Sequence, residues 1–259
     1  MQTILFHEII FGPIHSRRLG ISLGVNLLPT DGKICSFDCL YCEAGYNAQG
    51  QGTSGIPSKE AVKKALLLKL KAMKEAGESL DVITFSGNGE PTLHPQFNPI
   101  VRDVILLRDR YYPQAKVSVL SNSTMLSREK VVKALKLVDN NILKLDSAIA
   151  HTLRAINRPI SDGVQPDGVI ADLAKFDGKC IVQTLFVRGE HEGKRFDNTT
   201  DEEVAALIEA YKQIRPQEVM VYSIDRKTPE QNLQKISKEE LDKIGDRISA
   251  AGIKVQVNA

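Results

Sequence analysis

Residues 58–86 read SKEAVKKALLLKLKAMKEAGESLDVITFS, and this stretch indicates the fold class. Residues 58–78 have apolar side chains three or four positions apart, which predicts a helix with one buried face. Ser58 is placed to cap the start of this helix, and Gly77 is placed to stop its end. Residues 82–86 form a short apolar run, as expected of a strand that is buried on both faces. A helix that leads into a buried strand is the repeating unit of parallel α/β sheets.

The same alternation of strand and helix patterns continues along the chain. We expect strands at residues 20–28, 82–86, 116–121, 141–146, 180–187, 218–224 and 254–257. We expect helices at residues 58–78, 99–110, 127–138, 167–176, 200–214 and 237–251, with Ser127, Thr200 and Ser237 as further caps. Repeated strand–helix units imply right-handed crossovers and a mainly parallel sheet with helices outside it. About six units are fewer than the eight of a complete TIM barrel, so an open doubly wound sheet and a partial barrel both fit.

The chain shows no linker and no low-complexity tract, so we expect a single domain over residues 1–259. Its expected parts are an N-terminal extension (1–19), a core (20–230) and a final helix and strand (231–259). Residues 43–57 and 188–198 are polar, rich in glycine and without periodicity. Long irregular stretches in a compact domain are often functional, and we expect these two loops to cover the mouth of the sheet.

The charge balance gives little support to nucleic-acid binding, because 34 basic and 32 acidic residues leave a net charge of +2. Arg17, Arg18 and Arg226 are candidates for phosphate contacts, while ordinary surface exposure explains the Arg17–Arg18 pair without any ligand. No apolar run is long enough to span a membrane, and the first residues lack the features of a signal peptide. We therefore expect a cytoplasmic protein with no membrane partner.

Three of the four cysteines lie in one short segment, Cys35-Ser36-Phe37-Asp38-Cys39-Leu40-Tyr41-Cys42. The spacing is C-x3-C-x2-C, and it follows a predicted strand, where α/β proteins place ligand chemistry. Thiolates are suitable ligands for iron–sulfur clusters and for zinc. On a four-iron cluster, three thiolates leave one iron free to bind a substrate, whereas structural zinc would need a fourth ligand such as Cys180 or a histidine. Cys180 opens an apolar strand, so we expect it to be a small buried side chain.

Polar residues also follow the next three predicted strands. The first strand leads into Ser86-Gly87-Asn88-Gly89-Glu90-Pro91-Thr92, where two glycines allow the backbone to approach a ligand closely and Pro91 fixes the turn. The second strand ends at Asn122, and the third ends at Lys144 and Asp146. Taken singly, each group is explained by ordinary loop polarity. Because the ends of three consecutive parallel strands meet at one edge of the sheet, we expect them to form the rim of a cofactor site.

The cysteine spacing, with the aromatic Tyr41 just before the third cysteine, resembles the signature of the radical S-adenosylmethionine superfamily. The resemblance implies a partial TIM barrel and a [4Fe–4S] cluster on Cys35, Cys39 and Cys42. It implies that the open iron is chelated by the amino and carboxylate groups of S-adenosylmethionine. One electron from the reduced cluster would then yield methionine and a 5′-deoxyadenosyl radical, which abstracts hydrogen from a substrate.

The same resemblance assigns residues to the second cofactor. It implies that the backbone of Gly87, Asn88 and Gly89, together with the Glu90 acid, holds the methionine amino group. The other residues that it places in the cofactor site are Tyr41, Asn122, Lys144 and Asp146. An external one-electron reductant of the flavodoxin or ferredoxin type is the implied partner.

A narrower resemblance covers nearly the whole chain. Residues 11–26, Ile156-Asn157-Arg158-Pro159 and residues 221–229 are similar to iron–sulfur oxidoreductases grouped with the wyosine-forming tRNA enzymes. Those tRNA enzymes tend to carry extra cysteines for a second cluster, and only Cys180 remains here. The expected function is therefore radical chemistry on an unidentified small molecule, RNA or protein. The alternatives are a tRNA base-modifying enzyme and a non-catalytic zinc or iron–sulfur binding module.

Overall fold

The computed structural model describes residues 4–16 and 19–258, and its main feature is one large sheet. The strand order is β1-β2-β3-β4-β5-β6-β8-β10, and β7 and β9 pair with the C-terminal half of β6. Neighbours from β2 to β10 are parallel, while β1 is antiparallel to β2. The strands are β1 (Ile10–Ser16), β2 (Gly20–Val25), β3 (Val82–Phe85), β4 (Lys116–Ser121), β5 (Asn140–Lys144), β6 (Ile181–His191), β7 (Lys194–Asp197), β8 (Glu218–Ser223), β9 (Leu233–Lys235) and β10 (Val255–Asn258).

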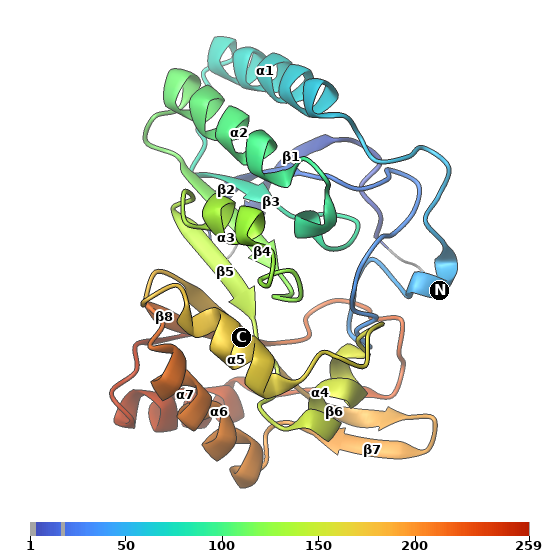
Figure 1. Cartoon of the computed structure of the whole chain (residues 1–259), viewed down its shortest axis with the longest axis vertical. Helices are drawn as coiled ribbons and strands as arrows, with labels where there is room; N and C mark the ends of the chain where they lie inside the picture. The colour runs from blue at the N-terminus through green and yellow to red at the C-terminus, as the bar shows by residue number, and fades with distance from the viewer. Residues whose placement is uncertain (1–3, 17–18, 259) are drawn as a thin grey trace.

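Helices connect the parallel strands and cover the outside of the sheet (Figure 1). They are α1 (Lys59–Glu75), α2 (Phe97–Tyr111), α3 (Glu129–Leu135), α4 (Ala150–Asn157), α5 (Pro166–Ala174), α6 (Asp201–Ile214) and α7 (Lys238–Ala250), with short 3-10 helices η1 (Asn47–Gln49) and η2 (Pro91–Leu93). Each of β2, β3, β4, β5, β6 and β8 is followed by helix before the next parallel strand. This arrangement confirms the predicted α/β partial barrel of about six units.

The two faces of the sheet carry different side chains. On β3, Ile83 and Phe85 pack into the main hydrophobic core beneath the helices. Thr84, between them, points to the opposite, concave face, where its hydroxyl lies 2.9 Å from the hydroxyl of Ser22 on β2. The main core includes residues from Ile10 to Ile248, so it joins both halves of the chain. The helices therefore cover an apolar outer face, and the concave face is left for a ligand.

Local sequence signals explain the start of three helices and the end of α1. The Ser58 hydroxyl accepts a hydrogen bond from the Ala61 N–H at 3.1 Å, and Gly77 takes a positive φ of 71° just after α1. Thr200 and Ser237 cap α6 and α7 as predicted. The prediction for Ser127 was wrong, because Arg128 stands at the cap position of α3 and makes no side-chain cap bond. The predicted apolar face of α1 is buried and consists of Val62, Leu66, Leu70 and Met73.

Part of the structure differs from the sequence prediction. Residues 188–198 are not a loop, because β6 continues to His191 and β7 returns antiparallel to it. This hairpin is polar and half exposed, so it lacks the apolar run by which a buried strand is recognised. Strand β1 was also missed, since its Gly12 and Pro13 are typical of turns rather than of strands. Helix α4 and strand β9 were too short to show a clear periodicity.

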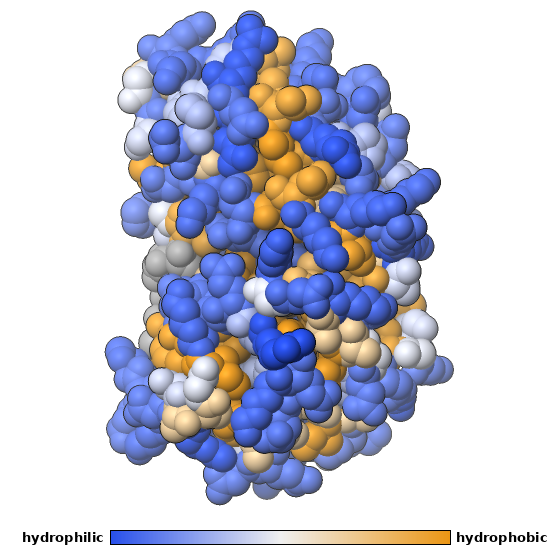
Figure 2. Space-filling view, turned by 60° about the vertical axis from the view of Figure 1, so that its left-hand side comes forward, coloured by the Kyte–Doolittle hydropathy of each residue, from blue (hydrophilic) through white to orange (hydrophobic). Residues whose placement is uncertain are grey.

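The outer surface contributes little to the site. Figure 2 shows a strip of apolar surface along one face of the molecule. The exposed apolar side chains include Leu68 on α1 and Leu106 on α2, which lie on the outer helices rather than at the cysteines. In the described part of the chain, no helix is long and apolar enough to cross a membrane.

Candidate cofactor site

Residues 33–45, called the cysteine loop below, begin against the end of β3. The Ile34 N–H donates to the Asn88 carbonyl at 3.1 Å, and the Glu90 N–H donates to the Ile34 carbonyl at 3.0 Å. Ile34 and Gly89 therefore form a short parallel bridge. This bridge places the first cysteine at the C-terminal edge of the parallel sheet, beside the strand ends that carry the other predicted site residues.

Gly87 and Gly89 are required by this packing. Both have positive φ, 138° and 131°, which side chains other than glycine rarely adopt. A Cβ on Gly89 would lie 1.9 Å from the Ile34 carbonyl oxygen, and a Cβ on Gly87 would lie 2.5 Å from Oδ1 of Asn26. From the sequence we expected these glycines to admit a ligand. In the structure they admit the cysteine loop and Asn26.

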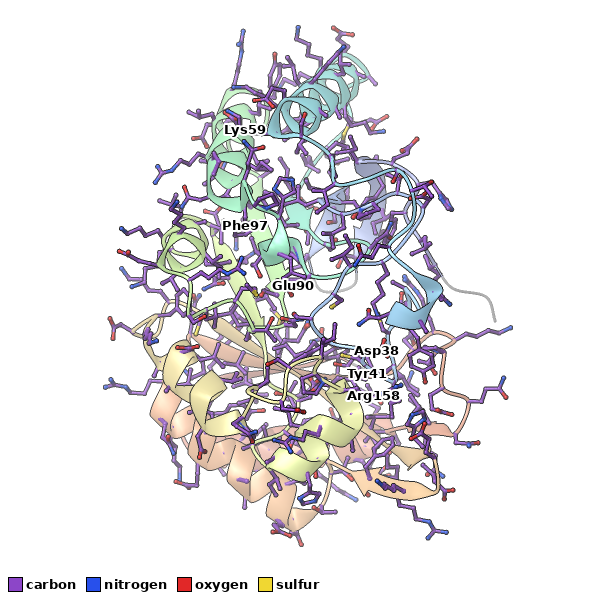
Figure 3. The ribbon with its side chains drawn as sticks, turned by 45° about the vertical axis from the view of Figure 1, so that its right-hand side comes forward. Asp38, Tyr41, Lys59, Glu90, Phe97 and Arg158 are labelled. Carbon is purple, nitrogen blue, oxygen red and sulfur yellow. The ribbon has the colours of Figure 1, made fainter. Side chains whose placement is uncertain are left out.

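The middle of the cysteine loop packs on the C-terminal end of α4. The last carbonyls of a helix have no partner within the helix. Here the Leu40 N–H donates to the Ile156 carbonyl and the Asp38 N–H donates to the Asn157 carbonyl, both at 3.0 Å. Figure 3 shows Asp38, Tyr41 and Arg158 lying together at this contact. The Ile156–Pro159 segment therefore supports the cysteine loop, a role that its sequence alone did not reveal.

Two side chains hold the cysteine loop from within. Lys33 is only 2% exposed, and its ammonium donates to the Gly45 carbonyl at 2.6 Å. Asn47, in η1, donates from Nδ2 to the carbonyls of Cys35 and Phe37 at 3.3 and 3.0 Å. These bonds reach backbone oxygens, so Lys33 and Asn47 shape the loop without touching a sulfur through them.

Glu90 and Asn88 lie behind the cysteine loop, where both are almost completely buried. The Glu90 carboxylate accepts hydrogen bonds from the Ser121 hydroxyl at 2.9 Å and the Asn122 N–H at 2.7 Å. Burial raises the pKa of Glu90, although these hydrogen bonds act against the rise. The Asn88 amide exchanges two 2.9 Å hydrogen bonds with the backbone of Phe6. Both side chains thus connect segments of this protein, and their contact with a methionine amino group stays a prediction.

Tyr41, Lys144 and Asp146 form a buried polar group on the other side of the cysteine loop. The Tyr41 hydroxyl donates to the Asp146 carboxylate, and the Lys144 ammonium lies 3.6 Å from that carboxylate. Burial raises the pKa of Tyr41, and the Asp146 charge raises it further. Burial acts to lower the pKa of Lys144, but the Asp146 charge outweighs it and holds the pKa above its usual value. Near neutral pH, Tyr41 is therefore a neutral donor and Lys144 is a cation.

Side-chain amides donate hydrogen bonds to two of the cysteine sulfurs. Nδ2 of Asn122 lies 3.6 Å from Sγ of Cys35, and Nδ2 of Asn157 lies 3.4 Å from Sγ of Cys39. Burial raises the pKa of both thiols, that of Cys39 to about 11. A free thiolate is therefore disfavoured at Cys39. A soft metal that replaces the thiol proton would remove this cost.

A cavity of about 480 Å³ opens beside the cysteine loop and extends into the concave side of the sheet. Of the predicted site residues, Tyr41, Cys42 and Gly87 line it. Deeper in the cavity, the lining comes from strands and includes Gln183 of β6 and Met220 of β8. Its volume falls within the range of small-molecule sites, roughly 300 to 1,000 Å³.

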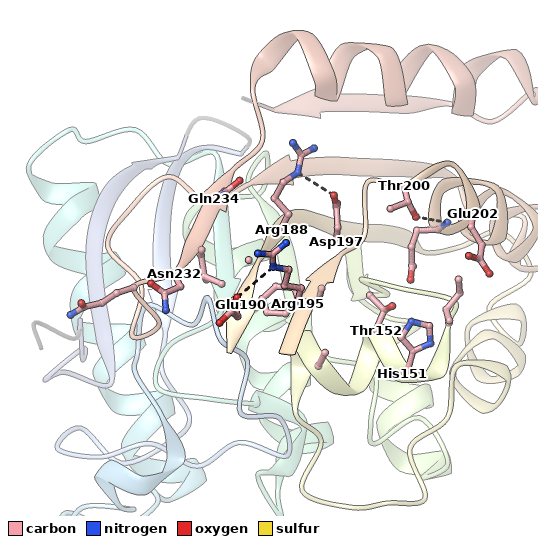
Figure 4. A pocket seen from close by; sticks show the side chains of 17 residues that line it. His151, Thr152, Arg188, Glu190, Arg195, Asp197, Thr200, Glu202, Asn232 and Gln234 are labelled. Carbon is pink, nitrogen blue, oxygen red and sulfur yellow. Dashed lines mark hydrogen bonds and ion pairs between the residues drawn. The ribbon is translucent and has the colours of Figure 1, made fainter. Parts of the chain in front are cut away.

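A larger cavity of about 1050 Å³ lies between α4, α6 and the β6–β7 hairpin (Figure 4). No cysteine lines it. Its charged side chains have both signs and several are paired with one another, as with Arg188 and Asp197, whose Nε and Oδ2 lie 3.3 Å apart. Tyr41, Cys42 and Gly87 therefore line the smaller cavity, and the other predicted site residues line neither of these two cavities.

Residues 30–193, more than half of the chain, match the family model of the radical SAM superfamily. The chain belongs to this superfamily, whose cofactors are an iron–sulfur cluster and S-adenosylmethionine. The UPF0026 protein MJ1312 of Methanocaldococcus jannaschii is 31% identical over 212 residues, which are 80% of this chain and 61% of that protein. The chain spans from 32% to 77% of the lengths of the curated relatives that it matches.

Solved structures show the same fold. Streptococcus suis SuiB bound to S-adenosylmethionine has a TM-score of 0.64 at 14% identity, covering 91% of this chain and 50% of SuiB. The structure of TYW1 with a lysine-pyruvate adduct bound has a TM-score of 0.61 at 15% identity, covering 88% of this chain and 73% of TYW1. At these identities the likeness concerns the fold alone.

The residues of the site fit the two cofactors. Three thiols pack in one cluster around Phe37, Leu40 and Tyr41, and the cavity for a second cofactor begins at Cys42. Within the described residues, no three His, Cys, Asp or Glu side chains meet closely enough to ligate one metal ion. Thiolates that each bind a different iron need not converge in this way. Donors to sulfur and to the loop, such as Asn157 and Asn47, were not predicted, because their partners are distant in sequence or are backbone atoms.

Proposed function

We propose that this chain is a radical S-adenosylmethionine enzyme whose [4Fe–4S] cluster is held by Cys35, Cys39 and Cys42. The observation that carries the proposal is the cavity that begins at Cys42, Tyr41 and Gly87 and leads into the barrel interior. When bound, the cofactors supply a 5′-deoxyadenosyl radical that abstracts hydrogen from a substrate. An external flavodoxin- or ferredoxin-type protein supplies the electron. In this proposal residues 1–259 act as one domain.

The protein's own residues hold the cysteine loop in place. The buried group of Tyr41, Lys144 and Asp146 closes one side of the cysteine loop, and Glu90 with Asn122 closes the other. These side chains are paired with one another and hold the cysteine loop from both sides. Gly87, Asn88 and Gly89 are proposed to bind S-adenosylmethionine through their backbone.

The test is anaerobic reconstitution with iron and sulfide, followed by dithionite and S-adenosylmethionine. We expect an iron–sulfur spectrum and the formation of 5′-deoxyadenosine and methionine. The variant Cys39→Ala should lose both the spectrum and the products. Cys180→Ala is the matched control, because Cys180 is also buried but lies in the main hydrophobic core, and this variant should retain both. Bound zinc without acid-labile sulfide would instead support a non-catalytic module.

A tRNA base is a narrower candidate substrate, suggested by the fold likeness to TYW1. The phosphate contacts that we predicted give it little additional support. Arg226 forms an ion pair with Glu43, with Nη1 and Oε2 2.7 Å apart, and Arg17 and Arg18 lie outside the described residues. Phosphate-dominated binding weakens steeply as salt is added. If the substrate is tRNA, its affinity for the reconstituted protein should fall in this way, and the absence of binding at low salt would exclude this candidate.

A further inference from the structure

Asn157 is the last residue of α4, and its side chain is 1% exposed. Its Nδ2 atom lies 3.4 Å from Sγ of Cys39, 2.6 Å from Oδ2 of Asp146 and 3.2 Å from the Tyr41 hydroxyl. Oδ1 of the same amide is buried without a hydrogen-bond partner among the described residues, while Nδ2 is within hydrogen-bonding distance of a carboxylate, a sulfur and a phenol. No water needs to enter for these acceptors to be satisfied.

The position of this amide is fixed from three directions. Helix α4 ends at Asn157, and the next residue, Arg158, takes the left-handed conformation that terminates the helix. The Asn157 carbonyl accepts the Asp38 N–H from the cysteine loop at 3.0 Å. Asp146, which accepts the stronger of the amide hydrogen bonds, is itself held by the Leu185 N–H at 2.9 Å. The donor thus cannot turn away from Cys39 without breaking other buried bonds.

We propose that Asn157 sets the reduction potential of the cluster by donating a hydrogen bond to the Cys39 sulfur. This inference rests on the proposed assignment of Cys39 as a cluster ligand. Reduction adds negative charge that is shared by the ligating sulfurs, and an N–H dipole directed at a sulfur stabilises that charge. The amide therefore raises the potential and makes the cluster easier to reduce. Asn157 is a positioning residue and does not take part in the chemistry itself.

The test compares reconstituted wild type with Asn157→Ala in an EPR-monitored redox titration without S-adenosylmethionine. We expect a lower midpoint potential in the variant, so that a smaller fraction of its cluster is reduced at a given ambient potential. If the alanine variant does not take up a cluster, Asn157→Leu fills a similar volume without an N–H and is measured in its place. An unchanged or higher potential in the variant that holds a cluster overturns the inference.

Asn47→Ala is the matched control. It removes two hydrogen bonds from the same loop, but these reach the carbonyls of Cys35 and Phe37 rather than a sulfur. Loosening the loop admits water, which stabilises the added charge, so this variant should keep the potential or raise it. A fall in Asn47→Ala equal to that in Asn157→Ala would assign the effect to loop geometry and reject the inference. A wild-type protein that holds no cluster would instead reject the proposed function.

Discussion

At the scale of single residues, the site depends on side chains and glycines that hold distant segments of the chain together. Glu90, Asn88 and the two neighbouring glycines were predicted to face a cofactor. In the structure they hold the cysteine loop, the N-terminal segment and the end of β4 in one arrangement, and their contact with a cofactor stays a prediction. The sequence did not reveal their immediate partners, because a short motif does not state which distant segment will pack against it.

Gly89→Ala should be strongly destabilising. The new Cβ would lie 1.9 Å from a backbone oxygen at a φ of 131°, so both a collision and backbone strain oppose it. Such a backbone conformation alone costs about 1–3 kcal/mol. We expect a lower melting temperature and a marked loss of bound iron after reconstitution.

Gly168→Ala provides the comparison. Gly168 lies in α5, and a Cβ there would meet nothing within 4 Å. Alanine favours a helix over glycine by roughly 0.5–1 kcal/mol, so this variant should melt at the same or a higher temperature and bind iron normally. Equal behaviour of the two variants would show that the Gly89 contact is not required.

Glu203 should make the stability of the protein depend on pH. Its carboxyl is 3% exposed, and burial raises its pKa above the ordinary glutamate value, although hydrogen bonds from Thr152 and Ser147 oppose the rise. The folded state therefore holds this proton more tightly than the unfolded state, and its contribution to stability is lost as pH rises through the raised pKa. The melting temperature of Glu203→Gln minus that of wild type should increase between about pH 5 and about pH 8. A difference that is independent of pH would contradict this.

At the scale of elements, the loops around the cysteines are ordered by a few polar bonds. Residues 51–56 contain no helix or strand in the described structure and all of them are exposed, so packing does not hold them. Asp31 accepts hydrogen bonds from the N–H and hydroxyl groups of Thr53 and Ser54, with distances from 2.7 to 3.2 Å. These bonds lower the pKa of Asp31. The exposed stretch around Thr53 and Ser54 is therefore ordered by hydrogen bonds to the Asp31 carboxylate rather than by burial of apolar side chains.

Asp31→Ala should release this loop while leaving the barrel folded. Asp31 is an exposed residue outside the core, so the global melting temperature should change little. Amide hydrogen exchange of residues 51–54 should speed up by a large factor in the variant, and β3 and β4 should remain protected. Ser58→Ala, which removes a hydroxyl at the nearby start of α1, is the control and should speed exchange in the first turn of α1 instead. Unchanged exchange at residues 51–54 would show that other contacts order the loop.

At the scale of the whole molecule, periodicity predicted the sheet and its helices well. Buried parallel strands and amphipathic helices can be recognised from local sequence patterns, and the cysteine spacing indicates the radical SAM superfamily. The sequence could not reveal β1, which contains Gly12 and Pro13, or the polar β6–β7 hairpin. It also could not pair Asn157 with Cys39, because that contact exists only after α4 and the cysteine loop have been brought together in space.

The molecule should unfold as one cooperative unit, because a single core runs from Ile10 to Ile248. Leu66→Ala on α1 and Leu207→Ala on α6 remove fully buried side chains at opposite ends of that core, each costing about 2–5 kcal/mol. Calorimetry should show one transition that either variant shifts as a whole. Leu68→Ala is the control, since Leu68 is 58% exposed on the same helix as Leu66. Two transitions, each shifted by one variant only, would divide the chain into two domains.

The support of the cysteine loop by α4 also has a consequence in time. Asn157 follows Cys39 by 118 residues, so at roughly 5–20 residues per second the ribosome adds it about 6 to 24 s later. During that interval the three cysteines have already been added to the chain, but the helix end that shelters them has not yet been made. Oxidants can reach them in that nascent chain, and iron placed there would lack its surroundings. We therefore expect the cluster to be inserted only after α4 has been synthesised.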